Sequence, residues 1–172
     1  HLHNNLPCEI RQFAFKNTSS ESKNISLLSY IQPVLSTFAD NAAHPAFSKL
    51  FLKLNYDIEL KAIIVSRKNR HNDDTVYCAV GFIEDIELNC ILSREEIIST
   101  PDGVQGVFNN KESIIPNYNS IPDPTIFIKT NLKLASDEQK ELNLFILTAL
   151  DKDTLIQNIS QLRHNNIIYT IP

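Results

Sequence analysis

The positions of the acidic side chains in the sequence do not favour a role in acid–base catalysis. Several carboxylates occur as adjacent pairs, such as Asp73-Asp74, Glu84-Asp85 and Glu95-Glu96. A catalytic acid must be held in a cleft beside the bond that it protonates, whereas neighbouring side chains at strand ends and in loops point in different directions. We therefore interpret these pairs as solvated surface groups.

The spacing of the histidines predicts no metal site. His44, His71 and His164 are far apart and include no i, i+4 pair that would place two imidazoles on one helix face. His1 and His3 stand at a ragged start and are candidates for a vector remnant. We expect no bound metal.

The cysteines and glycines are equally uninformative about catalysis. Cys8, Cys78 and Cys90 form no C-x-x-C pair and lie inside strand patterns, so we expect reduced thiols in the core. The sequence has no G-x-S-x-G elbow, and its three glycines are too few for a phosphate-binding loop. We therefore expect neither a covalent nucleophile nor a cofactor.

The segment from Asp40 to Phe51 has the most distinctive local sequence. A polar run reaches His44 and is followed at once by Pro45. Pro45 fixes its own φ and pushes the preceding residue toward extended geometry, so we expect the imidazole of His44 at a bend. Apolar residues follow, and we predict a strand from Phe47 to Tyr56.

Alternation of apolar and polar residues dominates the chain and predicts about nine strands. They are Ile10 to Lys16, Ile25 to Leu35, Phe47 to Tyr56, Ala62 to Arg67, Val76 to Ile83, Ile86 to Leu92, Thr125 to Leu134 and Glu141 to Leu150, with Glu95 to Thr100 as a short strand or a turn. We expect Pro33 to mark an edge position, a bulge or the end of its strand. The last two long strands are predicted to form a hairpin around Ser136 to Gln139.

The remaining segments predict turns, loops and one helix. Lys68 to Asp74 has no apolar residue and is expected to be an exposed hairpin loop, while Asn109 to Pro124 is expected to be a long connection. Pro101 to Gly103 predicts a turn. Lys152 to His164 has apolar residues at helical spacing, and Asp151 or Asp153 can cap that helix.

These elements predict a mainly all-β fold, an antiparallel two-sheet β-sandwich with one C-terminal helix. A chain of 172 residues is most simply one domain and buries roughly 70% of the surface that its unfolded form exposes. Its net charge of −4 gives no basic field, so we expect no nucleic acid partner and no direct membrane contact. We find no apolar run of about 18 residues and no charged-then-apolar start, so we expect this piece neither to span a membrane nor to carry an export signal.

The block His44-Pro45-Ala46-Phe47-Ser48-Lys49-Leu50-Phe51 also carries a family resemblance. With the strand patterning around it, from about Leu6 to Asn165, it resembles the glycoside phosphorylase family of cellobiose phosphorylase, and most closely the phosphorylase-like part of cyclic β-1,2-glucan synthases. The resemblance implies a super-sandwich domain of the galactose mutarotase-like type. That domain would span residues 1–172 and precede a helical catalytic barrel that this sequence does not contain.

The resemblance also implies a function. It implies a non-catalytic domain that packs on the catalytic barrel of its parent chain and shapes the sugar site there. The implied location is the cytoplasm, also where the parent is attached to a membrane. The implied partners are that barrel, β-glucan oligosaccharides and a second copy in a homodimer. The candidate contacts with carbohydrate or a neighbouring domain are Asn41, His44, Phe47, Arg67, Arg70 and Tyr118.

Two other functions stay open at this point. An autonomous carbohydrate-binding module for β-glucans would bind sugar without a catalytic partner, most simply through Tyr118 and the bend at His44. A mutarotase-like enzyme would need a histidine and a carboxylate that meet on one concave sheet face.

Overall fold

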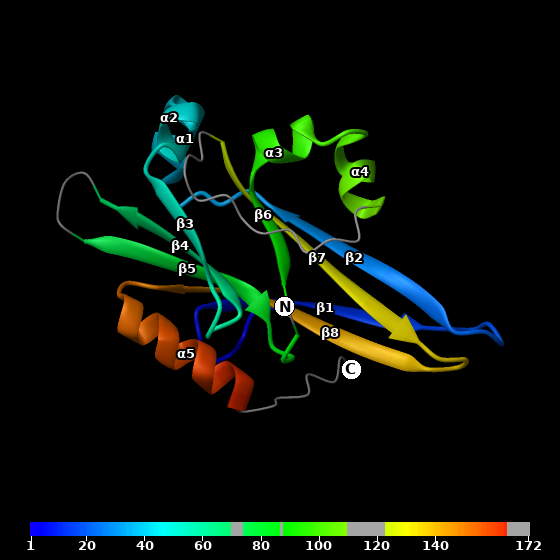
Figure 1. Cartoon of the computed structure of the whole chain (residues 1–172). Coiled ribbons are helices and arrows are strands. Elements are labelled where there is room, and N and C mark those ends of the chain that lie inside the picture. Colours follow the sequence, from blue (N-terminus) through cyan, green and yellow to red (C-terminus); the bar gives the residue numbers. More distant parts are fainter. Residues whose placement is uncertain (70–73, 87, 110–122, 165–172) are drawn as a thin grey trace.

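The computed structural model describes residues 1–69, 74–86, 88–109 and 123–164, which form two antiparallel β-sheets and five helices (Figure 1). The larger sheet has the strand order β1-β8-β5-β4-β3 and the smaller one β2-β7-β6. The strands of the larger sheet are β1 (Cys8–Lys16), β3 (Leu52–Asp57), β4 (Ala62–Lys68), β5 (Thr75–Phe82) and β8 (Gln139–Ala149). Those of the smaller sheet are β2 (Lys23–Ile31), β6 (Asn89–Ser93) and β7 (Pro124–Leu134).

The main core lies between the two sheets and confirms the predicted sandwich. Ile63, Val80 and Leu144 point inward from the larger sheet, and Ile126 and Ile128 point inward from the smaller one. All five are almost completely buried. Alternate residues of each strand supply this core because side chains alternate between the two faces of a sheet.

The predicted hairpin between the last two long strands is wrong. β7 pairs with β2 and β6, whereas β8 pairs with β1 and β5, so the chain crosses from one sheet to the other between Leu134 and Gln139. The apolar alternation correctly predicts that β7 and β8 face a common core. It does not determine whether two such strands lie side by side or across from each other.

The predicted helix is confirmed as α5 (Lys152–His164), which covers the outer face of the larger sheet (Figure 1). Leu155, Ile159 and Leu162 are buried against that face. The side chain of Asp151 accepts a hydrogen bond from the backbone N–H of Thr154 at 2.7 Å, which satisfies a free donor of the first turn. This second core encloses Cys8, and the inter-sheet core encloses the other two cysteines, all of them free and buried as predicted.

The strand predicted from Phe47 to Tyr56 is wrong in its first part. Two short helices, α1 (Phe38–Ala43) and α2 (Pro45–Lys49), precede β3, which begins only at Leu52. A proline at the first position of a helix is preorganised, because its fixed φ suits the helix and its missing N–H has no partner there anyway. No β-branched residue occurs between Phe38 and Leu50 to favour a strand instead.

The segment predicted as a short strand or turn at Glu95 to Thr100 is a helix, α3 (Arg94–Ser99), and a further helix, α4 (Gly103–Asn109), follows it. The turn between them is confirmed, with positive φ at Asp102 and Gly103. Ile97 and Val107 pack from these helices against the outer face of the smaller sheet. β2 ends before Pro33, as predicted. Most of the long connection, residues 110–122, and of the polar hairpin loop, residues 70–73, lies outside the described residues.

Candidate binding pocket at the helix corner

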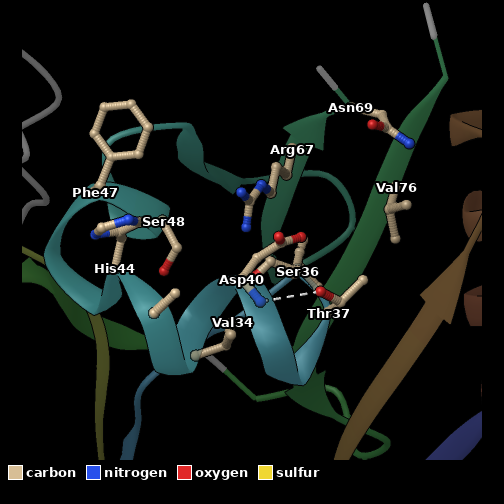
Figure 2. Close-up of a pocket in the computed structure, with 12 residues that line it drawn as sticks. Val34, Ser36, Thr37, Asp40, His44, Phe47, Ser48, Arg67, Asn69 and Val76 are labelled. Carbon is tan, nitrogen blue, oxygen red and sulfur yellow. Dashed lines mark hydrogen bonds between the residues drawn. The ribbon is translucent and has the colours of Figure 1, made fainter. Parts of the chain in front are cut away.

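A cavity of about 580 Å³ opens where α1 and α2 meet the ends of β4 and β5 (Figure 2). The loop after β2 forms one part of its wall with Ser36 and Thr37. The two helices contribute Asp40, His44, Phe47 and Ser48, and the strand side contributes Arg67, Asn69 and Val76. Most of the helical lining is exposed to solvent, so the cavity is an open pocket at one corner of the sandwich.

Local hydrogen bonds hold the two helices in place around this pocket. Thr37 caps α1, because its Oγ1 accepts from the backbone N–H of Asp40 at 3.2 Å. His44 ends α1 and begins α2, and its imidazole makes no capping bond. The buried hydroxyl of Ser48 donates to Oδ1 of Asn41 at 2.8 Å and thereby ties α2 to α1.

An ion pair anchors this corner to the smaller sheet. The Nζ of Lys49, at the end of α2, lies 2.7 Å from Oδ1 of Asp123, which directly precedes β7. Arg94, at the start of α3, lies 3.7 Å from the other oxygen of the same carboxylate. The side chain of Lys49 is 17% exposed, so this pair is screened less than a fully exposed one. The helix corner is therefore fixed with respect to both sheets.

Two polar atoms of the pocket wall have no hydrogen-bond partner among the described residues. The Nη1 of Arg67 and the Oγ of Ser36 are shielded from solvent and, in the described part of the chain, make no hydrogen bond. The Cζ of Arg67 lies 5.9 Å from the centroid of the Phe51 ring, which limits how the guanidinium can turn. Leaving a shielded donor unpaired costs about 1–3 kcal/mol, so a group that binds here gains from satisfying it.

Three of the six predicted contact residues line this one pocket. His44 and Phe47 meet Arg67, which is distant from them in sequence, whereas Asn41 does not line the pocket and is bonded to Ser48. Arg70 and Tyr118 lie outside the described residues.

Ser36, Asp40 and Asn69 were missed by the sequence reasoning. A signal for Asp40 did exist, because Thr37 and Asp40 have the spacing of a capped helix start.

The sandwich and its corner helices can be compared with known proteins. Residues 2–165 match the family described as glycosyl hydrolase 94, supersandwich domain. The chain belongs to this family. Over 66 residues, the supersandwich domain is 36% identical to cyclic beta-(1,2)-glucan synthase NdvB from Rhizobium meliloti (strain 1021). That alignment covers 38% of this chain and 2% of the relative, so the supersandwich domain corresponds to a small part of that protein.

The paired carboxylates of this supersandwich domain are only partly as expected. Asp85 and Glu95 are exposed, as predicted, and Lys61 lowers the pKa of Asp85 by a hydrogen bond and by its charge. Glu84 and Glu96 are half-buried, so the interpretation as solvated groups is wrong for these two.

The two half-buried carboxylates have different surroundings. Glu84 accepts hydrogen bonds from the backbone and side-chain amides of Asn143 at 2.9 and 2.8 Å. Partial burial raises the pKa of Glu96. Neither side chain lines the pocket at the helix corner.

The start of the supersandwich domain is ordered, in contrast to the ragged start that we expected. His3 is 8% exposed, and its Nδ1 accepts hydrogen bonds from the backbone N–H groups of Asn5 and Leu6, both at 3.1 Å. The described residues contain no group of three or more His, Cys, Asp or Glu that could hold a metal ion. Among the described helices none is long and apolar enough to cross a membrane.

Proposed function

We propose that this supersandwich domain is a non-catalytic part of a glycoside phosphorylase-like or cyclic β-1,2-glucan synthase-like enzyme. In this proposal it packs against the catalytic domain of the same protein and helps to shape the sugar site. The family match over residues 2–165 is the observation that carries the proposal. The similarity to a cyclic beta-(1,2)-glucan synthase supports β-1,2-linked glucan as the sugar class.

The helix corner supplies the contact surface for the catalytic domain. Four of the ten exposed large apolar side chains among the described residues fall between positions 34 and 50. They are Val34, Phe38, Phe47 and Leu50, with exposed fractions of 41%, 89%, 45% and 61%. All four belong to the helix corner or to the loop that leads into it, and a concentration of exposed apolar side chains in one segment favours an interaction site. We call these four residues the apolar ridge and assign it to the contact with the catalytic domain.

The chemistry of the pocket supports a role without turnover. A glycoside-processing acid works from a cleft that shields it beside the scissile oxygen. Asp40 and His44 line the same pocket, but both are exposed and lie on short helices at an open rim. A mutarotase-like site would instead place this pair on a concave sheet face.

A turnover assay tests the non-catalytic assignment directly. The chain is incubated with β-1,2-linked glucan oligosaccharides, with and without inorganic phosphate, and with freshly dissolved α-glucose. We expect no phosphorolysis, chain extension or anomer exchange above the rate in buffer. Turnover that disappears in the variants Asp40→Asn or His44→Ala would overturn the assignment.

The packing assignment is tested in the full parent protein. Phe38→Ser together with Leu50→Ser removes the two most exposed side chains of the ridge, and we expect lower activity and easier proteolytic release of this domain. The matched control is Ile98→Ser, which changes a side chain on α3 that is 68% exposed, between the values for Phe38 and Leu50. An unchanged parent enzyme, or a ridge double variant that only abolishes self-association in sedimentation, would argue against the packing role.

The alternative of an autonomous carbohydrate-binding module has its own test. Calorimetric titration of the chain with linear and cyclic β-1,2-glucans separates the two functions. A binding module is expected to bind these glucans alone at about micromolar affinity, near −8 kcal/mol. A domain that only completes the rim of a sugar site in the parent enzyme is expected to give no measurable heat at micromolar glucan concentrations.

A further inference from the structure

We infer that the pocket at the helix corner binds one neutral, hydroxyl-rich unit between Arg67 and Asp40, with a glucosyl residue as its ligand class. The choice of a glucosyl residue rests on the proposed function, whereas the existence of a hydroxyl site rests on the geometry alone. The site deepens the proposed role, because it gives this domain a direct contact with the sugar.

The donors of the site are already in place. Nη1 of Arg67 and Oγ of Ser36 are both shielded and without a hydrogen-bond partner among the described residues, and both belong to the wall of the same pocket. The ring of Phe51 restrains the guanidinium at 5.9 Å, so little freedom is lost when a ligand arrives. A hydroxyl oxygen can accept hydrogen bonds from such groups.

The acceptor of the site selects the charge of the ligand. Asp40 projects toward the same space as Arg67, and Thr37 fixes its position at the start of α1 (Figure 2). A phosphate or carboxylate ligand would pair with Arg67 but would be repelled by Asp40. An ammonium ligand would pair with Asp40 but would be repelled by Arg67. A hydroxyl group both donates and accepts, so neighbouring hydroxyls of one sugar ring suit the two charged groups together.

The rim adds an apolar surface for the carbon skeleton. Phe47 is 45% exposed at the pocket, and its ring packs edge-on against Phe51 with the centroids 5.1 Å apart. Aromatic side chains offer an apolar face to the C–H groups of a sugar. The cavity volume of about 580 Å³ lies within the ordinary range for small-ligand sites.

Titration followed by amide NMR tests the site in the whole chain. The probe is a β-1,2-linked glucan of two to four units, added to about 20 mM, since an open pocket with few contacts is expected to bind at about millimolar affinity. We expect saturable shifts at the amides of Thr37, Asp40, Ser48, Arg67 and Val76. Inorganic phosphate at equal ionic strength is the second probe, and we expect it to leave these amides unshifted.

Two variants separate a binding role from a structural one. Ser36→Ala removes a shielded hydroxyl that has no partner among the described residues, so the unfolding midpoint should stay the same or rise while the sugar affinity falls about threefold. Arg67→Met keeps the aliphatic stem and removes the guanidinium, and we expect at least about a tenfold loss. Arg11→Met is the matched control, because Arg11 lies exposed on β1, away from the pocket, and pairs with Glu9 at 2.7 Å.

Each contrary result has a definite meaning. Absent shifts, shifts centred elsewhere, or equal losses of affinity in the Arg11 and Arg67 variants would overturn the site. Phosphate shifts at these amides in place of sugar shifts would also overturn it, in favour of an anion site. None of these results bears on the non-catalytic role, which fails only in the turnover and packing assays.

Discussion

Arg163 at the end of α5 donates two hydrogen bonds to the carbonyl oxygen of Phe82 at the end of β5, from Nη2 at 2.9 Å and from Nε at 3.2 Å. The same guanidinium donates to the carbonyl of Leu60 at 2.6 Å and lies 5.6 Å from the centre of the Phe145 ring. One side chain therefore joins α5 to the end of β5 and to the turn between β3 and β4, both in the larger sheet. It satisfies carbonyl groups that the strand ladders leave free.

Replacing Arg163 should destabilise the domain more than its partial exposure suggests. We expect Arg163→Met to lower the free energy of unfolding by about 3 kcal/mol, because the carbonyls of Phe82 and Leu60 lose their donor. Arg163→Lys should lose about half as much, since an ammonium cannot reach all these oxygens in the planar arrangement of a guanidinium. Urea unfolding followed by circular dichroism measures both, with Arg11→Met as the exposed control. Equal stability of the two Arg163 variants and the control would refute the clamp.

Two glycines of the α3–α4 region should respond very differently to alanine. A Cβ at Gly106 would lie 1.8 Å from the carbonyl oxygen of Pro101, so the backbone itself must move. A Cβ at Gly103 meets nothing within 4 Å, and only its positive φ of 54° opposes alanine. We expect a loss of about 3 kcal/mol for Gly106→Ala and of about 1 kcal/mol for Gly103→Ala.

The location of the Gly106 effect can be measured separately. Val107, which packs α4 against the smaller sheet, should lose amide exchange protection in Gly106→Ala and keep it in Gly103→Ala. Equal protection of Val107 in the two variants would show that α4 tolerates the added methyl group.

The strands and the last helix could be predicted because their side chains obey simple periodicities. α5 buries one face, with apolar residues at every third to fourth position, whereas β4 and β5 are short apolar runs, a pattern typical of strands that are buried on both faces. Strand pairing could not be predicted in the same way. β7 and β8 have the pattern of a hairpin, yet they belong to different sheets. Two strands that face the same core show the same apolar alternation whether they pair side by side or lie in opposite sheets.

The pocket could be predicted only in part. His44, Phe47 and Arg67 were recognised from the local sequence, but their meeting depends on α1 and α2, which were predicted as a turn and a strand. Ser36 carries no sequence signal of its own. We infer its role from its hydroxyl, which is shielded and has no partner among the described residues. This property depends on how the helix corner packs and cannot be seen in the sequence.

Native thiols should be unreactive at neutral and mildly alkaline pH. Burial raises the pKa of Cys8 to about 11 and the pKa of Cys78 and Cys90 to about 12, so almost no thiolate exists at pH 8. We expect no reaction with a disulfide reagent in the folded state and reaction of three thiols in urea. Fast labelling of any thiol without denaturant would contradict the buried placement.

The same thiols should make the domain less stable in alkali. Their pKa is raised in the folded state, so the unfolded chain releases these protons first, from about pH 8.5. The contribution to stability is therefore complete below that pH and is lost as pH rises toward 11–12. Each buried thiol should lose about 1 kcal/mol per pH unit in this window. In Cys90→Ala the slope of stability against pH should be smaller than in the parent chain, and an unchanged slope would count against this origin.

Asn17 should be the most sensitive residue of the crossing between the sheets. Its side chain is 5% exposed, and its Nδ2 donates to the carbonyls of Leu134, Ala135 and Glu21 at 3.3, 2.7 and 2.8 Å. These bonds join the turn after β1 to the segment where the chain leaves β7 for β8.

We expect Asn17→Ala to lower the free energy of unfolding by about 2–3 kcal/mol, since the buried carbonyl of Leu134 and two partly buried carbonyls lose their donor together. Ser26→Ala is the matched control, because it removes an exposed hydrogen bond between Ser26 on β2 and Asn131 on β7. This change should cost less than about 1 kcal/mol. Denaturant unfolding of the two variants side by side measures the difference. If both lost the same small amount, the crossing would be held by the apolar core of β7 and β8 alone and not by this amide.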